Sequence, residues 1–211
     1  MNNLKQVKAV HYQKMKEIFN GNNIDVVFLD NKDDLKEYLL PHLNNISVGV
    51  GGSMTLFETG IIDLLRQQPI KFLDRYDTNL SREEVVEVFR QSLLCDLYLT
   101  STNAITLDGG IYNIDGSGNR VAAMIYGPKK VFIIVGKNKI FLDEESAIKH
   151  IKTVSAPANA IRLKRNTPCA KTGKCMDCHS NDRICSAYTK IVRQANLGRM
   201  TIIVVNEDLG Y

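Results

Sequence analysis

The stretch Ser47-Val48-Gly49-Val50-Gly51-Gly52-Ser53-Met54-Thr55-Leu56 decides how the rest of the chain is interpreted. Its apolar run predicts a buried strand over 46–50, and the glycines that follow let the backbone turn tightly and approach a ligand. Ser53 is placed to cap a helix, which would leave other first-turn N–H groups free to hold an anion. We therefore predict a phosphate or carboxylate site at this turn.

Strands and helices alternate on both sides of that turn. Apolar runs predict strands over 24–29, 70–73 and 96–100. Helical spacing or capping residues predict helices over 1–21, after Asp30 or Asn31, after Ser53, and after Ser81, whose helix extends to about residue 94. This alternation predicts an α/β fold with a mostly parallel sheet flanked by helices.

The middle of the chain is rich in turn residues. Asp-Gly and Gly-x-Gly-Asn sequences predict one or two short antiparallel hairpins over 104–125, with strands over 121–125 and 131–135. Polar residues gather at the ends of these strands, namely Thr102, Asn103, Asp108, Asn113, Asp115 and Asn119. Because open α/β sheets bind ligands at the carboxyl ends of their strands, we expect these side chains to face the glycine turn.

The last third predicts a helix that starts at Asp143, is interrupted at Pro157 and resumes over 158–163, followed by a hairpin over 186–205. A run of basic residues lies between them, formed by Arg162, Lys164, Arg165, Lys171 and Lys174. Such a run either forms a solvated face or attracts an anionic cofactor or an electron-transfer partner.

Four of the five cysteines, Cys169, Cys175, Cys178 and Cys185, lie within the segment 166–186. Four thiolates complete either a tetrahedral zinc site or an iron–sulfur cluster, and the spacing does not choose between them. A redox dithiol and unliganded packing cysteines are the alternatives, and His179 is a substitute ligand. Cys95 is expected to be buried and inert.

Composition limits the class of protein. A length of 211 residues and a hydrophobic share of 44% fit a single packed domain over 1–211. The net charge of +4 does not argue for a nucleic-acid partner. The N-terminus lacks the apolar core of a signal peptide and no run is long enough to span a bilayer, so a cytoplasmic location is expected.

Several motifs together resemble the LUD (lactate-utilisation) domain family. They are the glycine turn with Glu58 and Gly60, the stretch Thr102–Gly109, and the stretch Asn113–Ala122. The cysteine motifs and the ending Glu207-Asp208-Leu209-Gly210-Tyr211 resemble its cysteine-bearing single-domain branch. The resemblance covers the chain from about residue 5 onward.

That resemblance implies a fold like ribose-5-phosphate isomerase and the CoA transferases. It implies a base, Glu58 or Asp108, since proton abstraction beside a carbonyl needs a positioned carboxylate. With the turn residues above, the expected ligand-binding set is Gly49, Gly51, Gly52, Ser53, Thr55, Thr102, Asn103, Gly109, Asn113, Asp115, Gly116, Asn119 and Arg120.

The family is linked to oxidation of lactate to pyruvate with iron–sulfur subunits, which favours a cluster over zinc. Lactate-complex members commonly lack these four cysteines, so the substrate stays open. The leading interpretation is a component of organic-acid oxidation that binds a small anionic metabolite and a metal or cluster. The alternatives are a stand-alone isomerase or transferase acting on a sugar phosphate or acyl-CoA with a structural zinc, and a non-catalytic sensor. Each is compatible with a homo-oligomer.

Overall fold

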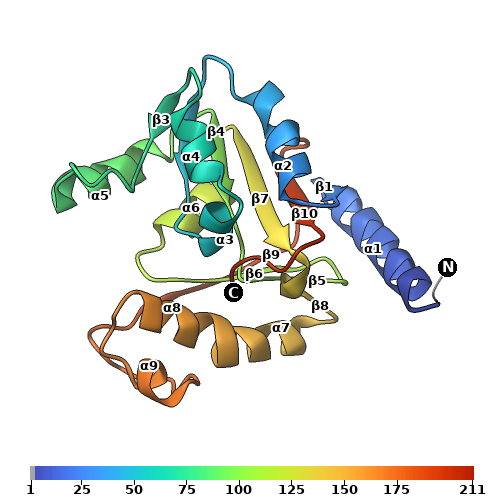
Figure 1. Cartoon of the computed structure of the whole chain (residues 1–211). Helices are drawn as coiled ribbons and strands as arrows, with labels where there is room; N and C mark the ends of the chain where they lie inside the picture. The colour runs from blue at the N-terminus through green and yellow to red at the C-terminus, as the bar shows by residue number, and fades with distance from the viewer. Residues whose placement is uncertain (1–2) are drawn as a thin grey trace.

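The computed structural model describes residues 3–211, which form two sheets with helices around them (Figure 1). Within these residues the larger sheet has six parallel strands in the order β1-β10-β7-β4-β2-β3. Their bounds, in that order, are Ile24–Leu29, Met200–Val205, Lys130–Gly136, Leu97–Thr100, Ser47–Val50 and Lys71–Leu73. The predicted α/β fold with a parallel sheet flanked by helices is confirmed.

The last strand of the chain lies inside this sheet. β10 pairs in parallel with β1 on one side and with β7 on the other, where Met200 lies opposite Val131. All six residues of β10 are buried, because an apolar strand needs cover on both faces, and a central position provides it. The hairpin predicted over 186–205 is therefore wrong, since β9 (Ala187–Ile191) belongs to the other sheet.

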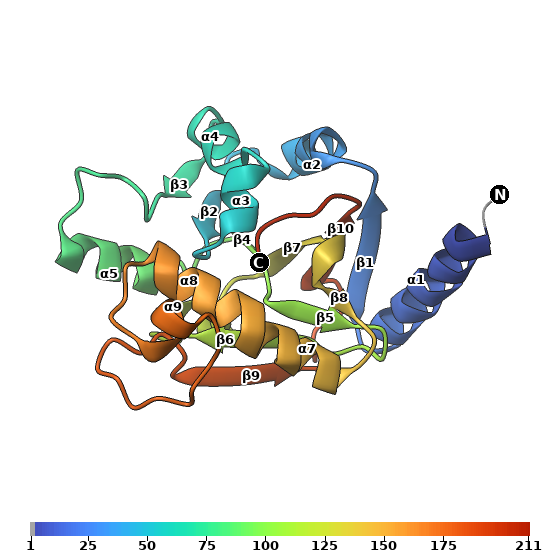
Figure 2. The same cartoon turned by 60° about the horizontal axis from the view of Figure 1, so that its bottom comes forward.

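The smaller sheet has the order β8-β5-β6-β9 (Figure 2). β5 (Ala104–Thr106) and β6 (Ile111–Asp115) form the first predicted antiparallel hairpin. β9 pairs antiparallel with β6, and β8 (Ile140–Phe141) adds a parallel edge to β5. The chain thus crosses from the end of β4 in the larger sheet directly into the smaller one.

The strand predicted over 121–125 is wrong. Residues Asn119–Ile125 form helix α6, which starts after Gly118 in the left-handed region at φ 81°. A short apolar run does not distinguish a strand from a buried helix. Here Arg120, Val121 and Met124 are buried, which places the first turn of α6 against the sheets.

The remaining helices cover the sheets and connect their strands. Their bounds are α1 Asn3–Gly21, α2 Lys32–Leu39, α3 Met54–Glu58, α4 Ile61–Arg66, α5 Arg82–Gln91, α7 Glu144–His150, α8 Ala156–Arg162 and α9 Pro168–Thr172. Short 3₁₀ turns follow α2 at Leu40–His42 and β7 at Lys137–Lys139. Two of the predicted caps are present, because Asn31 accepts hydrogen bonds at the start of α2 and Ser81 forms a capping box with Glu84 at α5.

Two helices differ from the expected course. The helix expected after Ser53 is broken between α3 and α4 at Gly60, which adopts a left-handed φ of 70°. The interruption expected at Pro157 is instead a π-helical turn over Ile151–Ser155 that joins α7 to α8. Pro157 lies in the first turn of α8, where proline fits well.

Two apolar clusters fill the faces of the larger sheet. Ile133 and Ile202 belong to the cluster that includes α1 and α6, whereas Phe132 and Ile203 belong to the cluster that includes α2, α3 and α4. Neighbouring residues alternate between these clusters, as strand geometry requires. A third cluster packs α7 on the smaller sheet. No helix within residues 3–211 combines the length and the apolarity needed to cross a bilayer.

Candidate functional site

The glycine turn contains two glycines with different surroundings. Gly51 is buried and donates its N–H to the Leu99 carbonyl at 2.9 Å; a Cβ there would collide with Thr100 Oγ1 and lie 3.1 Å from Arg120 Cγ. Gly52 is exposed, and a Cβ there would lie 3.4 Å from the Arg75 guanidinium. Gly51 is thus required by the packing of the fold, whereas Gly52 leaves space in front of Arg75.

This difference predicts opposite effects for two matched substitutions. Gly51→Val should destabilise the protein by about 1–3 kcal/mol or more, because overpacking forces neighbouring groups to move. Gly52→Val should leave the fold largely intact but fill the space beside Arg75, and so abolish anion-induced stabilisation. Thermal unfolding of both variants with and without anion measures this, and equal behaviour of the two would contradict it.

Ser53 precedes α3, but its role as a capping residue is not realised. Its hydroxyl makes no cap hydrogen bond and, among the described residues, Ser53 Oγ is buried without a partner. The following helix has only five residues, so it offers no strong helix dipole at this turn. The backbone N–H of Ser53 donates to Tyr76 Oη at 3.3 Å. What remains for a ligand is the unpaired hydroxyl.

Arg120 joins the ends of β4 and β6. It is only 8% exposed and forms an ion pair with Asp115, with 3.1 Å between Nε and Oδ2. Its other N–H groups donate to the Ser101 carbonyl at 2.9 Å, Asn113 Oδ1 at 2.6 Å, Asn103 Oδ1 at 3.2 Å and the Ile114 carbonyl at 2.9 Å. All five N–H donors of the guanidinium are therefore occupied, and this hydrogen-bond network holds Arg120 and its partners in fixed positions.

Lys139, at the end of the turn after β7, is a buried cation that has no carboxylate partner within residues 3–211. It is 3% exposed, and its Nζ donates to Thr55 Oγ1 at 2.9 Å and to Ser101 Oγ at 3.2 Å. Burial and the nearby positive charge of Arg120 lower the pKa of Lys139 to about 7, while Glu58 opposes the shift. An amine in this state can hold an anion or exchange a proton near neutral pH.

These groups surround a cavity of about 340 Å³ between the glycine turn, the start of α6 and the end of α8. Figure 2 shows α8 below the start of α3. Among the described residues of the lining, Asp115 is the single acidic side chain, and the cationic side chains are Arg75, Arg120, Lys139, Arg162 and Arg165. The charged side chains of the lining are therefore predominantly positive.

Arg75 is the cation most available to a ligand. Its guanidinium lies 4.2 Å from the centre of the Phe89 ring, which holds it in place by a cation–π contact. Within residues 3–211 it makes no side-chain hydrogen bond and no ion pair, in contrast to Arg120. Its planar set of N–H groups matches the geometry of a carboxylate or phosphate.

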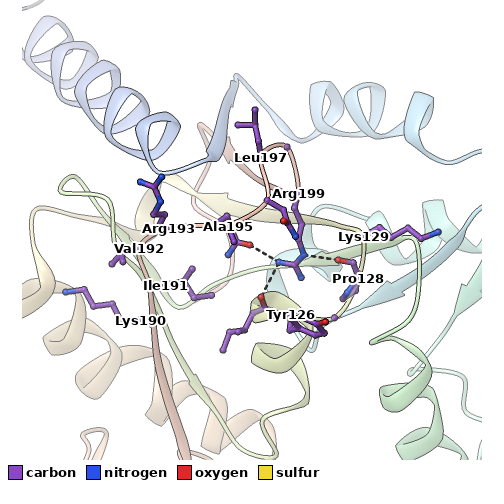
Figure 3. Close-up of a pocket in the computed structure, with 15 residues that line it drawn as sticks. Tyr126, Pro128, Lys129, Lys190, Ile191, Val192, Arg193, Ala195, Leu197 and Arg199 are labelled. Atoms are coloured by element: carbon purple, nitrogen blue, oxygen red, sulfur yellow. Dashed lines mark hydrogen bonds between the residues drawn. The ribbon is translucent and has the colours of Figure 1, made fainter.

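A larger hollow, of about 840 Å³, lies between the loop after α6 and the loop before β10 (Figure 3). Arg199 lies at its base, and Figure 3 shows the guanidinium bonded to the Pro128 carbonyl, at 3.0 Å. Its other donors reach Met124, Ala123 and Gln194. Since these bonds satisfy the carbonyls at the end of α6, the buried charge has a structural role, and the smaller cavity is the better candidate site.

A family model described as LUD domain matches residues 12–205. The chain belongs to the LUD domain family. The crystal structure of a DUF162 family protein from Deinococcus radiodurans is 13% identical and has a TM-score of 0.53, covering 93% of this chain and 97% of that chain. Ribose 5 phosphate isomerase A from Neisseria gonorrhoeae is 14% identical over 53% of each chain, with a TM-score of 0.32, too low to bear on the fold. None of the curated proteins compared with the chain matches it.

The cavity of this LUD domain contains many of the residues expected from sequence. Those that line it are Gly52, Ser53, Thr102, Asn103, Asp115, Gly116, Asn119 and Arg120. Thr55 and Asn113 lie behind the lining, where they contact Lys139 and Arg120. Gly49 lies outside the cavity; a Cβ there would lie 2.9 Å from Ser92 Oγ, so this glycine serves the packing of β2.

The two expected bases are not in the cavity lining. Glu58 is exposed and accepts a hydrogen bond from the Gly210 N–H at 2.6 Å, so it holds the C-terminal residues beside α3. Asp108 lies in the turn between β5 and β6 and bonds Thr106 Oγ1. The neighbouring Gly109 faces Ile18 of α1. Neither carboxylate therefore lines the cavity, although Glu58 is close enough to Lys139 to oppose the lowering of its pKa.

The cationic residues that sequence reasoning missed lie where strands end. Arg75 follows β3 and Lys139 follows β7, so the rule that ligands bind at carboxyl ends of strands applies to both. Arg162 and Arg165 belong to the basic run noted in the sequence, and they line the cavity. Tyr211 also lines the cavity, although nothing in the C-terminal sequence 207–211 predicted this position.

The cysteine segment lies beyond α8. Cys169, Cys175, Cys178 and Cys185 are all half-buried free thiols, and Cys175 Sγ contacts Asp177. As arranged here, the described residues contain no group of three Cys, His, Asp or Glu side chains close enough to share a metal ion. Cys95 is buried as expected, and burial raises the pKa of its thiol to about 11, which makes it unreactive.

Proposed function

We propose that this LUD domain binds a small organic anion in the cavity at the glycine turn and acts as a component of organic-acid oxidation. The observation that carries the proposal is the uncompensated charge of the lining. Within the described residues, Arg75 has no ion pair and Lys139 is bonded only to hydroxyl groups. The single acidic side chain of the lining, Asp115, is already paired with Arg120. Binding a carboxylate or phosphate would neutralise cations that are otherwise costly to hold together.

A thermal-shift screen tests this proposal with 2-hydroxy acids, 2-oxo acids, sugar phosphates and CoA esters. A ligand at about a hundredfold excess over its Kd adds about 2.7 kcal/mol of stability. We expect small organic acids to raise the melting temperature of the wild type. We expect no such rise in Arg75→Gln, which loses the unpaired guanidinium.

The matched control is Arg90→Gln, since Arg90 is an exposed arginine on α5 that bonds Glu87 outside the cavity. It should respond to anions as the wild type does. If no anion stabilises the wild type, or if Arg75→Gln responds fully, the proposal fails. Stabilisation by sugar phosphates or CoA esters alone would favour the isomerase or transferase interpretation.

We also propose that the cysteine segment binds zinc or an iron–sulfur cluster after a local rearrangement. Two observations support it: the four thiols are free, and no residue between Pro168 and Lys190 is buried. A segment without a core of its own costs little to rearrange and gains most from a metal that cross-links it. An iron–sulfur cluster here would suit redox partners, and the exposed Lys171 and Lys174 would attract an acidic one.

Cys175→Ser tests the metal proposal. The variant should lose the bound metal, because three remaining thiolates cannot complete the site, while the cavity should still bind its anion. Metal analysis and a visible absorption spectrum of protein purified without oxygen provide the measurement. Cys95→Ser is the control and should keep the metal. Full metal content in Cys175→Ser, or a wild type without metal, would reject the assignment.

A further inference from the structure

Lys139 has a hydrogen-bond arrangement that an anion-binding role alone does not require. Its Nζ contacts two hydroxyl groups, and each hydroxyl donates its own hydrogen elsewhere. Thr55 Oγ1 donates to the Leu209 carbonyl at 3.2 Å, and Ser101 Oγ donates to the Thr102 carbonyl at 3.3 Å. Both hydroxyls therefore present lone pairs to Nζ, at 2.9 Å and 3.2 Å.

This arrangement fits a neutral amine. An ammonium has three N–H donors, whereas a neutral amine has two donors and one lone pair. Within residues 3–211 the Nζ has two hydrogen-bond partners and no carboxylate. The neutral form is thus fully satisfied as a donor and keeps its lone pair unoccupied. Burial and the charge of Arg120 lower the pKa of Lys139 to about 7, so this form is well populated at neutral pH.

The amine also borders the cavity that holds the unpaired guanidinium of Arg75. A ligand with a carboxylate or phosphate at one end and a carbonyl group nearby would use both groups. The guanidinium would take the anionic end, and the amine would face the carbonyl. A cavity of about 340 Å³ suits a small molecule of this kind.

We infer that Lys139 is a nucleophile that forms an imine with the carbonyl carbon of a small anion bound in this cavity, such as a 2-oxo acid. The inference rests on the proposed function, because the cavity must first bind the anion. The nitrogen lone pair adds to the carbonyl carbon, the two hydrogens of the neutral amine pass to the carbonyl oxygen, and that oxygen leaves as water when the C=N bond forms. Nothing is oxidised or reduced in this step.

The experiment is reductive trapping in the full chain. The protein is incubated with pyruvate or with dihydroxyacetone phosphate in the presence of cyanoborohydride, which converts an imine to a stable amine. Intact mass and peptide mapping then locate the adduct. We expect modification at Lys139 at least about tenfold above any other lysine at neutral pH, because exposed lysines are almost fully protonated there. The two probes distinguish a 2-oxo acid from a carbonyl-bearing phosphate.

Two variants sharpen the test. Lys139→Arg keeps a positive charge but cannot form the imine, so its adduct should disappear. Lys137→Arg changes an exposed lysine two residues away and should trap as the wild type does. If either probe stabilises the protein thermally but no adduct forms at Lys139, the inference fails and the anion-binding proposal stands. If neither probe binds nor traps, the inference fails, and the thermal-shift screen with the other anions decides the anion-binding proposal separately. Equal labelling of Lys137 and Lys139 also overturns the inference.

Discussion

Lys139→Met should make the protein more stable near neutral pH and at the same time weaken its binding of anions. Methionine has a similar length and no charge, so it removes the cost of burying an ammonium that has no carboxylate partner. Replacing buried charge with a well-packed apolar group often stabilises by about 1–4 kcal/mol. The lost amine removes one of the cations that surround the cavity.

The dependence of this effect on pH follows from the lowered pKa of Lys139. Its pKa is about 7 in the folded protein, whereas an exposed lysine has a pKa of 10.5. Between these values the unfolded chain binds more protons than the folded one, so the stability of the wild type rises with pH. Below about pH 7 the lysine is charged in both states and the burial cost is fully present. The advantage of Lys139→Met should therefore be largest at low pH and shrink as pH rises toward 10.

Urea unfolding at several pH values measures this prediction. Lys137→Met is the matched control, because that side chain is exposed and bonds only the Asn206 carbonyl. It should change neither the stability nor its pH dependence by much. A Lys139→Met variant that is less stable than the wild type at every pH would show that the lysine is a favourable structural group rather than a strained functional one.

Arg120→Met should be among the most destabilising single substitutions in the chain. The change removes five hydrogen bonds at once and leaves Asp115, only 8% exposed, without its counter-ion. Breaking a buried pair by removing one partner costs about 3–5 kcal/mol. Asn113 would lose its partner at the same time, which adds to the cost.

A double variant separates the two parts of this loss. Arg120→Met with Asp115→Asn removes the unpaired charge, so it should recover part of the stability lost in Arg120→Met. Arg120→Lys should recover little, because an ammonium cannot reproduce the five-donor contacts of the guanidinium. Chemical denaturation of the three variants provides the comparison. A loss below about 1 kcal/mol for Arg120→Met would mean that the pair is not structurally important.

Much of the fold was predictable because local signals agreed with the tertiary structure. The strand over 24–29 and the capping box at Ser81 depend on neighbouring residues alone, and both are present. The errors arose where distant residues decide the outcome. The residues around 121–125 do not by themselves distinguish the expected strand from helix α6. The helix depends on the buried contacts of Arg120, which are made with residues outside this segment. The central place of β10 likewise depends on β1 and β7.

The candidate site was predictable in position but not in chemistry. The glycine turn and the polar residues after β4 and β6 do meet at one cavity, as the strand-end rule implies. The sequence did not indicate that Asn113 and Asp115 hydrogen-bond Arg120, and their role as ligand-binding residues stays a prediction. Arg75 follows β3 and Lys139 follows β7, and these strands are far apart in the sequence. Only the folded chain therefore brings the two side chains to the same cavity.

A crystal structure of the protein with pyruvate would show whether the cavity at the glycine turn binds a small organic anion. We expect density for the anion in front of Gly52, with its carboxylate within about 3 Å of the Arg75 guanidinium. We also expect the carbonyl end to lie toward Lys139. Pyruvate bound in the hollow beside Arg199 instead, or a cavity that stays empty at saturating pyruvate, would rule out this site.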